Sequence, residues 1–170
     1  MALKSNKMTI LRNIICLLLF STANLLAGDK NIEAYIDRYQ ELAISEMERT
    51  GVPASIKLAQ GILESNAGRS TLARKANNHF GIKCGSRWRG KKHYRKDDDY
   101  KRGRLVKSCF RSYKNARRSY IAHSDFLLDN NRYDFLFRLK KTDYKKWAKG
   151  LKKAGYATSK TYEKKLTFKS

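Results

Sequence analysis

The sequence is poor in proline and glycine, with 1 and 10 of them in 170 residues. This scarcity excludes a collagen-like or Gly/Pro-rich low-complexity chain. Acidic residues are also few, since 15 Asp and Glu stand against 38 Lys and Arg, for a formal charge of +23. Ten tyrosines and seven phenylalanines argue against a disordered polycation. The length suits one folded domain, and the charge points to a polyanionic partner: nucleic acid, anionic lipid or an acidic wall polymer.

Long hydrophobic runs are missing as well. The apolar stretch of residues 14–20 is too short, and too interrupted by polar neighbours, for a membrane span. Lys4, Lys7 and Arg12 precede it and small residues near Ala27 follow it, which is typical of a secretory signal peptide. We therefore expect a signal peptide over residues 1–27, with an uncleaved anchor as the alternative, and a mature domain over residues 28–170. Removing the three basic residues lowers the charge from +23 to +20. The expected location is secreted or periplasmic, associated with the cell envelope.

Cysteine is scarce, with three in the chain. Cys16 would leave with the signal peptide, so Cys84 and Cys109 remain as an even pair in an oxidising compartment. This predicts a disulfide between them. A zinc site that adds His79 and His93 is the alternative, but no paired CxxC or HxxxH spacing supports it. We expect no metal and no cofactor.

Apolar periodicity predicts helices over residues 31–49, 53–66, 70–76, 116–155 and about 162–168. Between them, residues 79–113 alternate irregularly and contain several glycines. Short strands of a hairpin or small sheet are predicted at residues 80–83, 92–95 and 104–107. The order of helices, a small β-lobe and more helices predicts an α+β fold in a single domain, without internal repeats.

Glu64 lies in the last turn of a largely apolar predicted helix, on nearly the same side as Ile56 and Leu63. A carboxylate beside a core face either finds a partner or has its pKa raised by desolvation. A raised pKa is what the general acid of glycoside cleavage requires. The spacing is equally compatible with a solvated glutamate at a helix end.

Asp97, Asp98 and Asp99 form an acidic triplet within a strongly basic stretch. Three interpretations are open from composition: a loop tip neutralised by its neighbours, a cation site, or the second carboxylate of a catalytic pair.

Four segments resemble family 73 of the glycoside hydrolases, the glucosaminidase domains of bacterial autolysins and of the flagellar peptidoglycan hydrolase. Residues 51–68 are similar to the family's catalytic helix, and residues 78–83 match its Asn-x-Phe-Gly-Ile-Lys segment. Residues 110–120 match its Phe-Arg-x-Tyr and Ser-Tyr segment, and residues 154–166 match its Ala-Gly-Tyr-Ala-Thr segment with the following Tyr-x-x-Lys-Leu. The matches occur in order and cover about residues 31–168.

The resemblance implies a lysozyme-like α+β fold, mainly helical with a small β-hairpin lobe. It implies an endo-β-N-acetylglucosaminidase that cleaves peptidoglycan glycan strands, with Glu64 as general acid. It implies a second carboxylate within Asp97, Asp98 and Asp99 and an active-site tyrosine at Tyr156, for which a core tyrosine is the alternative. The separation of the two carboxyl groups would distinguish inversion from retention, unless the β-lobe moves or the substrate's N-acetyl group attacks.

Sugar rings bind on aromatic side chains, and the candidates here are Phe80, Trp88, Tyr94 and Tyr100. The alternative is that these side chains form the core of the β-lobe. The sequence departs from the family at Asn66-Ala67, where many members have Gly-Trp, and at Ser159, where Asp is usual. Three other functions stay open: a muramidase or lytic transglycosylase with the same acid, a non-catalytic wall-binding module, and a nucleic-acid binder. We expect a monomer whose partners are peptidoglycan strands and anionic envelope polymers, and no nucleic acid.

Overall fold

The structure, a computed structural model, describes residues 30–101, 103–157 and 159–169. The signal peptide expected over residues 1–27 lies outside them. The chain divides into compact units of residues 1–34 and 35–170. Residues 30–34 of the first unit are helical, and the sheet, the core clusters and the candidate site belong to the second unit. None of the helices in these described ranges is long and apolar enough to cross a membrane.

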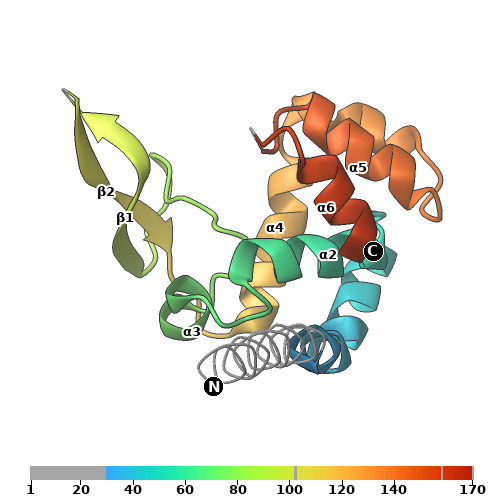
Figure 1. The fold of residues 1–170 in the computed structure, drawn as a ribbon, viewed down its shortest axis with the longest axis horizontal. Helices are drawn as coiled ribbons and strands as arrows, with labels where there is room; N and C mark the ends of the chain where they lie inside the picture. The colour runs from blue at the N-terminus through green and yellow to red at the C-terminus, as the bar shows by residue number, and fades with distance from the viewer. Residues whose placement is uncertain (1–29, 102, 158, 170) are drawn as a thin grey trace, which may run out of the picture. The chain divides into compact units, whose positions relative to one another are not determined.

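The elements follow the order that the α+β prediction requires, with helices first, then a hairpin and then more helices (Figure 1). Helical residues 30–50 are followed by α2 (Ala54–Ser65), α3 (Thr71–Ala76), β1 (Lys92–Lys101), β2 (Arg104–Arg111), α4 (Ala116–Leu128), the 3-10 helix η1 (Asn131–Arg138), α5 (Tyr144–Lys153) and α6 (Tyr162–Lys169). Over the residues that the structure describes, the fold is mainly helical with one two-stranded sheet, which confirms the predicted fold class.

Helix α2 is the centre of the helical part. Pro53 occupies the position just before its first residue and makes no side-chain capping bond, and Asn66 ends the helix in the left-handed conformation with φ of 52°. Seven of its residues are buried, so most of its circumference faces protein. Ile56 and Ala59 pack with Leu127 and Trp147 in the largest apolar cluster, which also draws on η1 and α6. This enclosure fixes the position of the side chains at the C-terminal end of α2.

The β-lobe is an antiparallel hairpin of β1 and β2, in which Lys92 pairs with Arg111 and Lys101 with Arg104. An irregularity in register separates Lys96 from Tyr100, so the acidic triplet lies on β1 at this bulge. The interpretation of the triplet as a loop tip is therefore wrong, because the chain reverses after Lys101. Phe110 of β2 packs with Leu72 and Ala76 and so fastens the hairpin to α3.

Two predicted elements differ from the structure. Residues 80–83 are not a strand and form one isolated bridge, Lys83 with Phe110. The side chain of Asn78 explains this, because it binds both the N–H and the C=O of Ile82 and thereby closes a turn. The single helix predicted over 116–155 is interrupted after Leu128 by η1, since apolar periodicity cannot distinguish one helix from consecutive helical pieces. The predicted end at Gly155 is confirmed, with φ of 73° just after α5.

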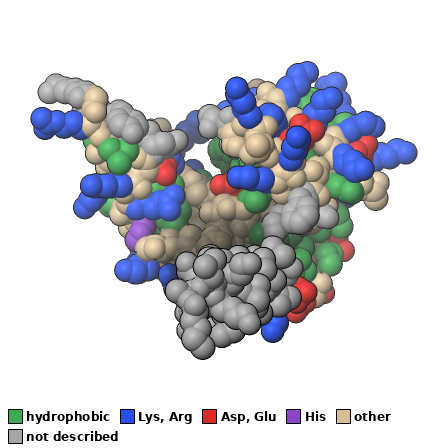
Figure 2. Space-filling model, in the orientation of Figure 1, with side chains coloured by type: hydrophobic (Ala, Val, Ile, Leu, Met, Phe, Trp, Pro, Cys, Tyr) green, Lys and Arg blue, Asp and Glu red, His purple; other side chains and the backbone are tan. Residues whose placement is uncertain are grey.

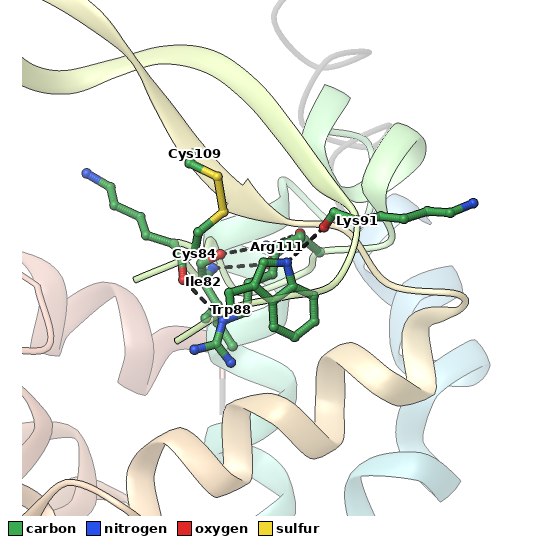
Figure 3. Close-up of a disulfide and its surroundings, with 8 residues drawn as sticks. Ile82, Cys84, Trp88, Lys91, Cys109 and Arg111 are labelled. Carbon is green, nitrogen blue, oxygen red and sulfur yellow. Dashed lines mark hydrogen bonds between the residues drawn. A yellow bond between two sulfur atoms is a disulfide. The ribbon is translucent and has the colours of Figure 1, made fainter. Parts of the chain in front are cut away.

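The predicted disulfide between Cys84 and Cys109 is present, with a Cα–Cα distance of 5.5 Å (Figure 3). It joins the loop after Ile82 to β2. Backbone hydrogen bonds run beside it from Cys84 N–H to Cys109 C=O, 2.9 Å, and from Arg111 N–H to Ile82 C=O, 3.0 Å. The Arg111 side chain also donates to the Lys83 carbonyl. Residues 82–85 are therefore held against the hairpin both covalently and by hydrogen bonds.

Candidate active site

A cleft of about 790 Å³ lies between the β-hairpin side and the helices of the C-terminal half, and Figure 2 shows the surface hollowed there. One wall comes from the disulfide-bonded loop and the hairpin, and the other from α2, α4, η1 and the chain from residue 156 to α6. Its lining includes Glu64, Asp97 and Tyr156, together with Phe80, Tyr162 and Ser159. Three of the predicted catalytic positions thus share one cavity.

Glu64 is in the last turn of α2 and faces the cleft. Glu64 is exposed at the surface of the cleft, and the protein around it nevertheless desolvates its carboxylate. This desolvation raises the pKa of Glu64 to about 7. A carboxyl group with such a pKa carries a proton near neutral pH and can give it to a leaving oxygen.

Two tyrosines accompany Glu64. Tyr156 follows Gly155 directly, and its ring stacks on that of Tyr162 with centroids 5.9 Å apart. Burial raises the pKa of Tyr156 well above its usual value, and the nearby charge of Glu64 adds to this effect. Burial also raises the pKa of Tyr162, so both phenols stay protonated at neutral pH, and both lie close enough to Glu64 to be affected by its charge.

Asp97 lies on the hairpin wall of the cleft. Its carboxylate is 3.3 Å from Lys83 Nζ and 3.4 Å from Arg95 Nη2, and a quarter of the side chain is exposed. The side chains of Asp98 and Asp99, and that of Tyr100, lie outside the described residues. Among the described side chains of the triplet, Asp97 is therefore the one that lines the cleft. It forms ion pairs with Lys83 and Arg95.

Of the aromatic side chains predicted to bind sugar rings, the cleft lining includes only Phe80 among the described side chains. Phe80 lines the cleft, but it is buried in a core cluster and stacks on His123. Trp88 and Tyr94 do not line this cleft. The Trp88 indole packs edge-on against Tyr113 and beneath the Arg111 guanidinium, while Tyr94 is 56% exposed on β1. Their binding of sugar rings stays a prediction.

Basic side chains supply a feature of the cleft that sequence reasoning did not find. Five of them line it: Lys83, Arg95, Arg111, Arg132 and Lys165. Arg132 lies over the ring of Tyr133, 4.7 Å from its centroid. Because these residues come from separate parts of the chain, no local motif marks them. The arrangement suits an anionic ligand.

A second feature missed from the sequence lies behind the cleft. Lys57 of α2 is fully buried and contacts His123 of α4, whose other ring nitrogen contacts Tyr156. The sequence contains one indication of this buried lysine, because Lys57 lies between the apolar residues Ile56 and Leu58 of α2. The described residues contain no group of three His, Cys, Asp or Glu side chains that could hold a metal ion.

A sequence profile of the glucosaminidase family, described as mannosyl-glycoprotein endo-β-N-acetylglucosaminidase, matches residues 40–168. The chain belongs to this family. Among its relatives, the peptidoglycan hydrolase FlgJ of Pseudomonas aeruginosa is 32% identical over an alignment of 151 residues, which covers 83% of this chain and 38% of FlgJ. The exo-glucosaminidase LytG of Bacillus subtilis is 31% identical over an alignment of 140 residues, which covers 79% of this chain and 49% of LytG. This glucosaminidase chain thus spans less than half the length of these curated relatives.

Solved structures resemble the glucosaminidase chain over most of its length. The glycoside hydrolase domain of Salmonella typhimurium FlgJ superposes with a TM-score of 0.66 at 28% identity, covering 81% of this chain and 84% of that domain. The catalytic domain of the autolysin Auto from Listeria monocytogenes has a TM-score of 0.70 at 28% identity, with 81% of each chain covered. The lysozyme-like glucosaminidase fold expected from the four sequence segments is therefore confirmed.

Proposed function

We propose that this glucosaminidase domain is an exported peptidoglycan hydrolase that cleaves the glycan strand as an endo-β-N-acetylglucosaminidase, with Glu64 as general acid. The observation that carries the proposal is the position of Glu64: it faces the cleft, and desolvation raises its pKa to about 7. The carboxyl group gives its proton to the glycosidic oxygen as the bond to the anomeric carbon breaks. The names of the relatives, peptidoglycan hydrolase and exo-glucosaminidase, support a wall glycan as substrate.

Asp97 is the proposed second carboxylate. It lines the same cleft from the hairpin wall, where its carboxylate lies 3.3 Å from Lys83 Nζ and 3.4 Å from Arg95 Nη2. The second carboxylate of such a pair activates water or stabilises a developing positive charge on the sugar. The five basic side chains of the cleft support an anionic glycan, because the peptide stems of a wall glycan carry carboxylates, as do muramic acid residues that lack a stem.

Export and retention at the envelope complete the proposal. The signal peptide over residues 1–27 would deliver a domain of residues 28–170, whose formal charge is +20. This charge would hold the enzyme on anionic envelope polymers. In Figure 2 Lys and Arg side chains cover much of the visible surface of the C-terminal helices.

The test is cleavage of purified peptidoglycan by the wild type, by Glu64→Gln and by the control Glu48→Gln, which changes an exposed glutamate. Loss of a general acid should lower kcat roughly 100- to 10,000-fold, and the control should match the wild type. The products should have N-acetylglucosamine at the reducing end. Wild-type-like lysis by Glu64→Gln would overturn the role of Glu64.

Products also separate the alternative functions. Reducing-end N-acetylmuramic acid would indicate a muramidase, and an anhydro-muramic product a lytic transglycosylase. Binding of sacculi by the wild type without any release of glycan would indicate a non-catalytic wall-binding module.

A further inference from the structure

Lys57 is a buried charge that the proposed reaction does not use. It is 0% exposed in the middle of α2, where an amine without partners would be strongly destabilising. Its Nζ donates to the Tyr120 carbonyl at 2.8 Å and to Ser124 Oγ, and it lies 3.1 Å from His123 Nδ1. An ammonium group has three protons, and these are three acceptors. The ammonium form of Lys57 is thus fully satisfied.

Two nearby carboxylates favour the ammonium form of Lys57. Glu46 is buried, and its attraction for Lys57 opposes the effect of burial. Asp125 also attracts Lys57, whereas Arg49 repels it while pairing with both acids, at 2.7 Å from Glu46 and 2.8 Å from Asp125. Burial is the largest effect and lowers the pKa of Lys57 to about 7. Below that pH the lysine is charged.

The proton positions on His123 follow from this arrangement. Burial, reinforced by Lys57, lowers the pKa of His123 well below its usual value, so the imidazole is neutral. Since the ammonium of Lys57 offers a proton to Nδ1, Nδ1 accepts and the ring proton lies on Nε2. Nε2 is 3.0 Å from Tyr156 Oη, to which it therefore donates. Phe80 stacks on the imidazole at 4.0 Å and 11°, which fixes the plane of the ring.

The direction of the last bond decides what Tyr156 can do. Its oxygen accepts from His123, so its own O–H proton is free to point into the cleft, where Glu64 lies. With the other tautomer of His123, Tyr156 would donate to Nε2, and its proton would point away from the cleft.

We propose that Lys57 and His123 are positioning residues that orient Tyr156 as a hydrogen-bond donor toward Glu64. When Glu64 transfers its proton to the glycosidic oxygen, its O–H bond breaks and a carboxylate remains. Tyr156 keeps its own proton and donates a hydrogen bond to this carboxylate. The inference rests on the proposed function for its catalytic meaning, but the tautomer of His123 does not depend on activity.

The first test is the imidazole tautomer in the wild-type protein, by long-range ¹H–¹⁵N NMR at about pH 6, below the pKa of Lys57. The chain has three histidines, and the spectrum of His123→Gln assigns the signal of His123. We expect neutral His123 with its proton on Nε2. A proton on Nδ1, or a charged ring, in the wild-type protein would overturn the proposal, and the folded His123→Gln variant serves only to assign the signal. This result is independent of whether Glu64→Gln abolishes lysis.

The second test is kinetic. Lys57→Met should leave KM unchanged and lower kcat roughly 10- to 100-fold, the loss expected for one hydrogen bond to a charged group. Tyr156→Phe should lower kcat by a similar factor. A variant with both Lys57→Met and Tyr156→Phe should lose no more kcat than either single variant, because the two residues act through the same hydrogen bond.

His123 gives the matched pair for this test. Gln can still donate a proton from its amide to Tyr156, whereas Leu cannot, so His123→Gln should retain more kcat than His123→Leu at equal thermal stability. Additive losses in the double variant, or a wild-type kcat for folded Lys57→Met, would contradict the proposal.

Discussion

Gly61 and Tyr35 are in such close approach that a Cβ atom on Gly61 would lie 2.5 Å from Tyr35 Oη. The same atom would be 3.2 Å from Tyr120 Oη. The two hydroxyl groups are hydrogen-bonded to each other at 3.0 Å, and Tyr35 Oη is also 3.0 Å from His79 Nδ1. Glycine in the middle of α2 therefore makes room for a buried polar cluster one turn before Glu64.

This relationship predicts that Gly61→Ala is destabilising. Alanine in place of glycine within a helix is normally worth about 1 kcal/mol of added stability. Here the methyl group must displace Tyr35, and overpacking of this kind costs about 1–3 kcal/mol. Thermal and urea denaturation would measure the change.

The matched control is the same substitution in a Tyr35→Phe background, where the closest atom is missing. The alanine should cost less there. Equal costs in both backgrounds would show that the hydroxyl of Tyr35 does not set the requirement for glycine.

The pH dependence of cleavage should follow Glu64. Its pKa is raised to about 7, and the protonated form is the competent acid. The value of kcat/KM should therefore be lost as pH rises through about 7, falling about tenfold per pH unit above it. Initial rates on soluble glycan fragments from about pH 5 to 9 would show this limb.

Lys57 also loses its proton near pH 7, so it needs a separate control. The alkaline limb should persist in Lys57→Met if Glu64 causes it. A rate that stays constant up to about pH 9 in the wild type would contradict the role of Glu64.

The disulfide should contribute both stability and cleft geometry. Cys84 and Cys109 close a loop with a sequence separation of 25 residues, for which the chain-entropy model gives about 3 kcal/mol. The double Cys→Ser variant should unfold at a lower temperature and have a raised KM, because Lys83 and Gly85 beside the bond line the cleft. Reductant should destabilise the wild type and leave the variant unchanged. Two reactive thiols in the exported protein would show that the bond does not form.

Local sequence signals were sufficient for much of the fold. The helix ends at Asn66 and Gly155 were predictable because left-handed residues terminate helices there. The segment of residues 80–83 was not, since its conformation depends on Asn78 binding the backbone of Ile82 and Arg111, a contact that involves another part of the chain. Strand propensity alone does not contain this information.

Some residues of the candidate site could also be predicted from local sequence, and others could not. Glu64 and Tyr156 could be located because they lie within recognisable segments of the chain. The cationic lining could not, because Arg95, Arg132 and Lys165 meet in the folded molecule from distant positions. Lys57 was visible as a lysine on an apolar helix, but its role depends on His123, 66 residues away.

Arg132 should favour anionic over neutral substrates. It lines the cleft and is stacked on Tyr133, which keeps its guanidinium in place. Arg132→Gln should raise KM several-fold on peptidoglycan strands, which bear carboxylates, and change it little on neutral N-acetylglucosamine oligomers. Arg87→Gln, an exposed position outside the cleft, is the control of equal charge. Equal changes on both substrates would mean that Arg132 acts through packing with Tyr133.

Binding to the wall should depend strongly on salt. The mature chain would carry +20, so its attachment to anionic polymers is expected to be electrostatic. The screening length falls from about 10 Å at 0.1 M salt to about 3 Å at 1 M, which weakens contacts between exposed charges. Glu64→Gln allows binding to intact sacculi to be measured by co-sedimentation without lysis. The bound fraction should fall steeply over this range of NaCl and remain unchanged in sucrose of equal osmolality. Binding that persists at 1 M salt would instead indicate that the cleft alone, through uncharged contacts with the glycan, retains the protein on the wall.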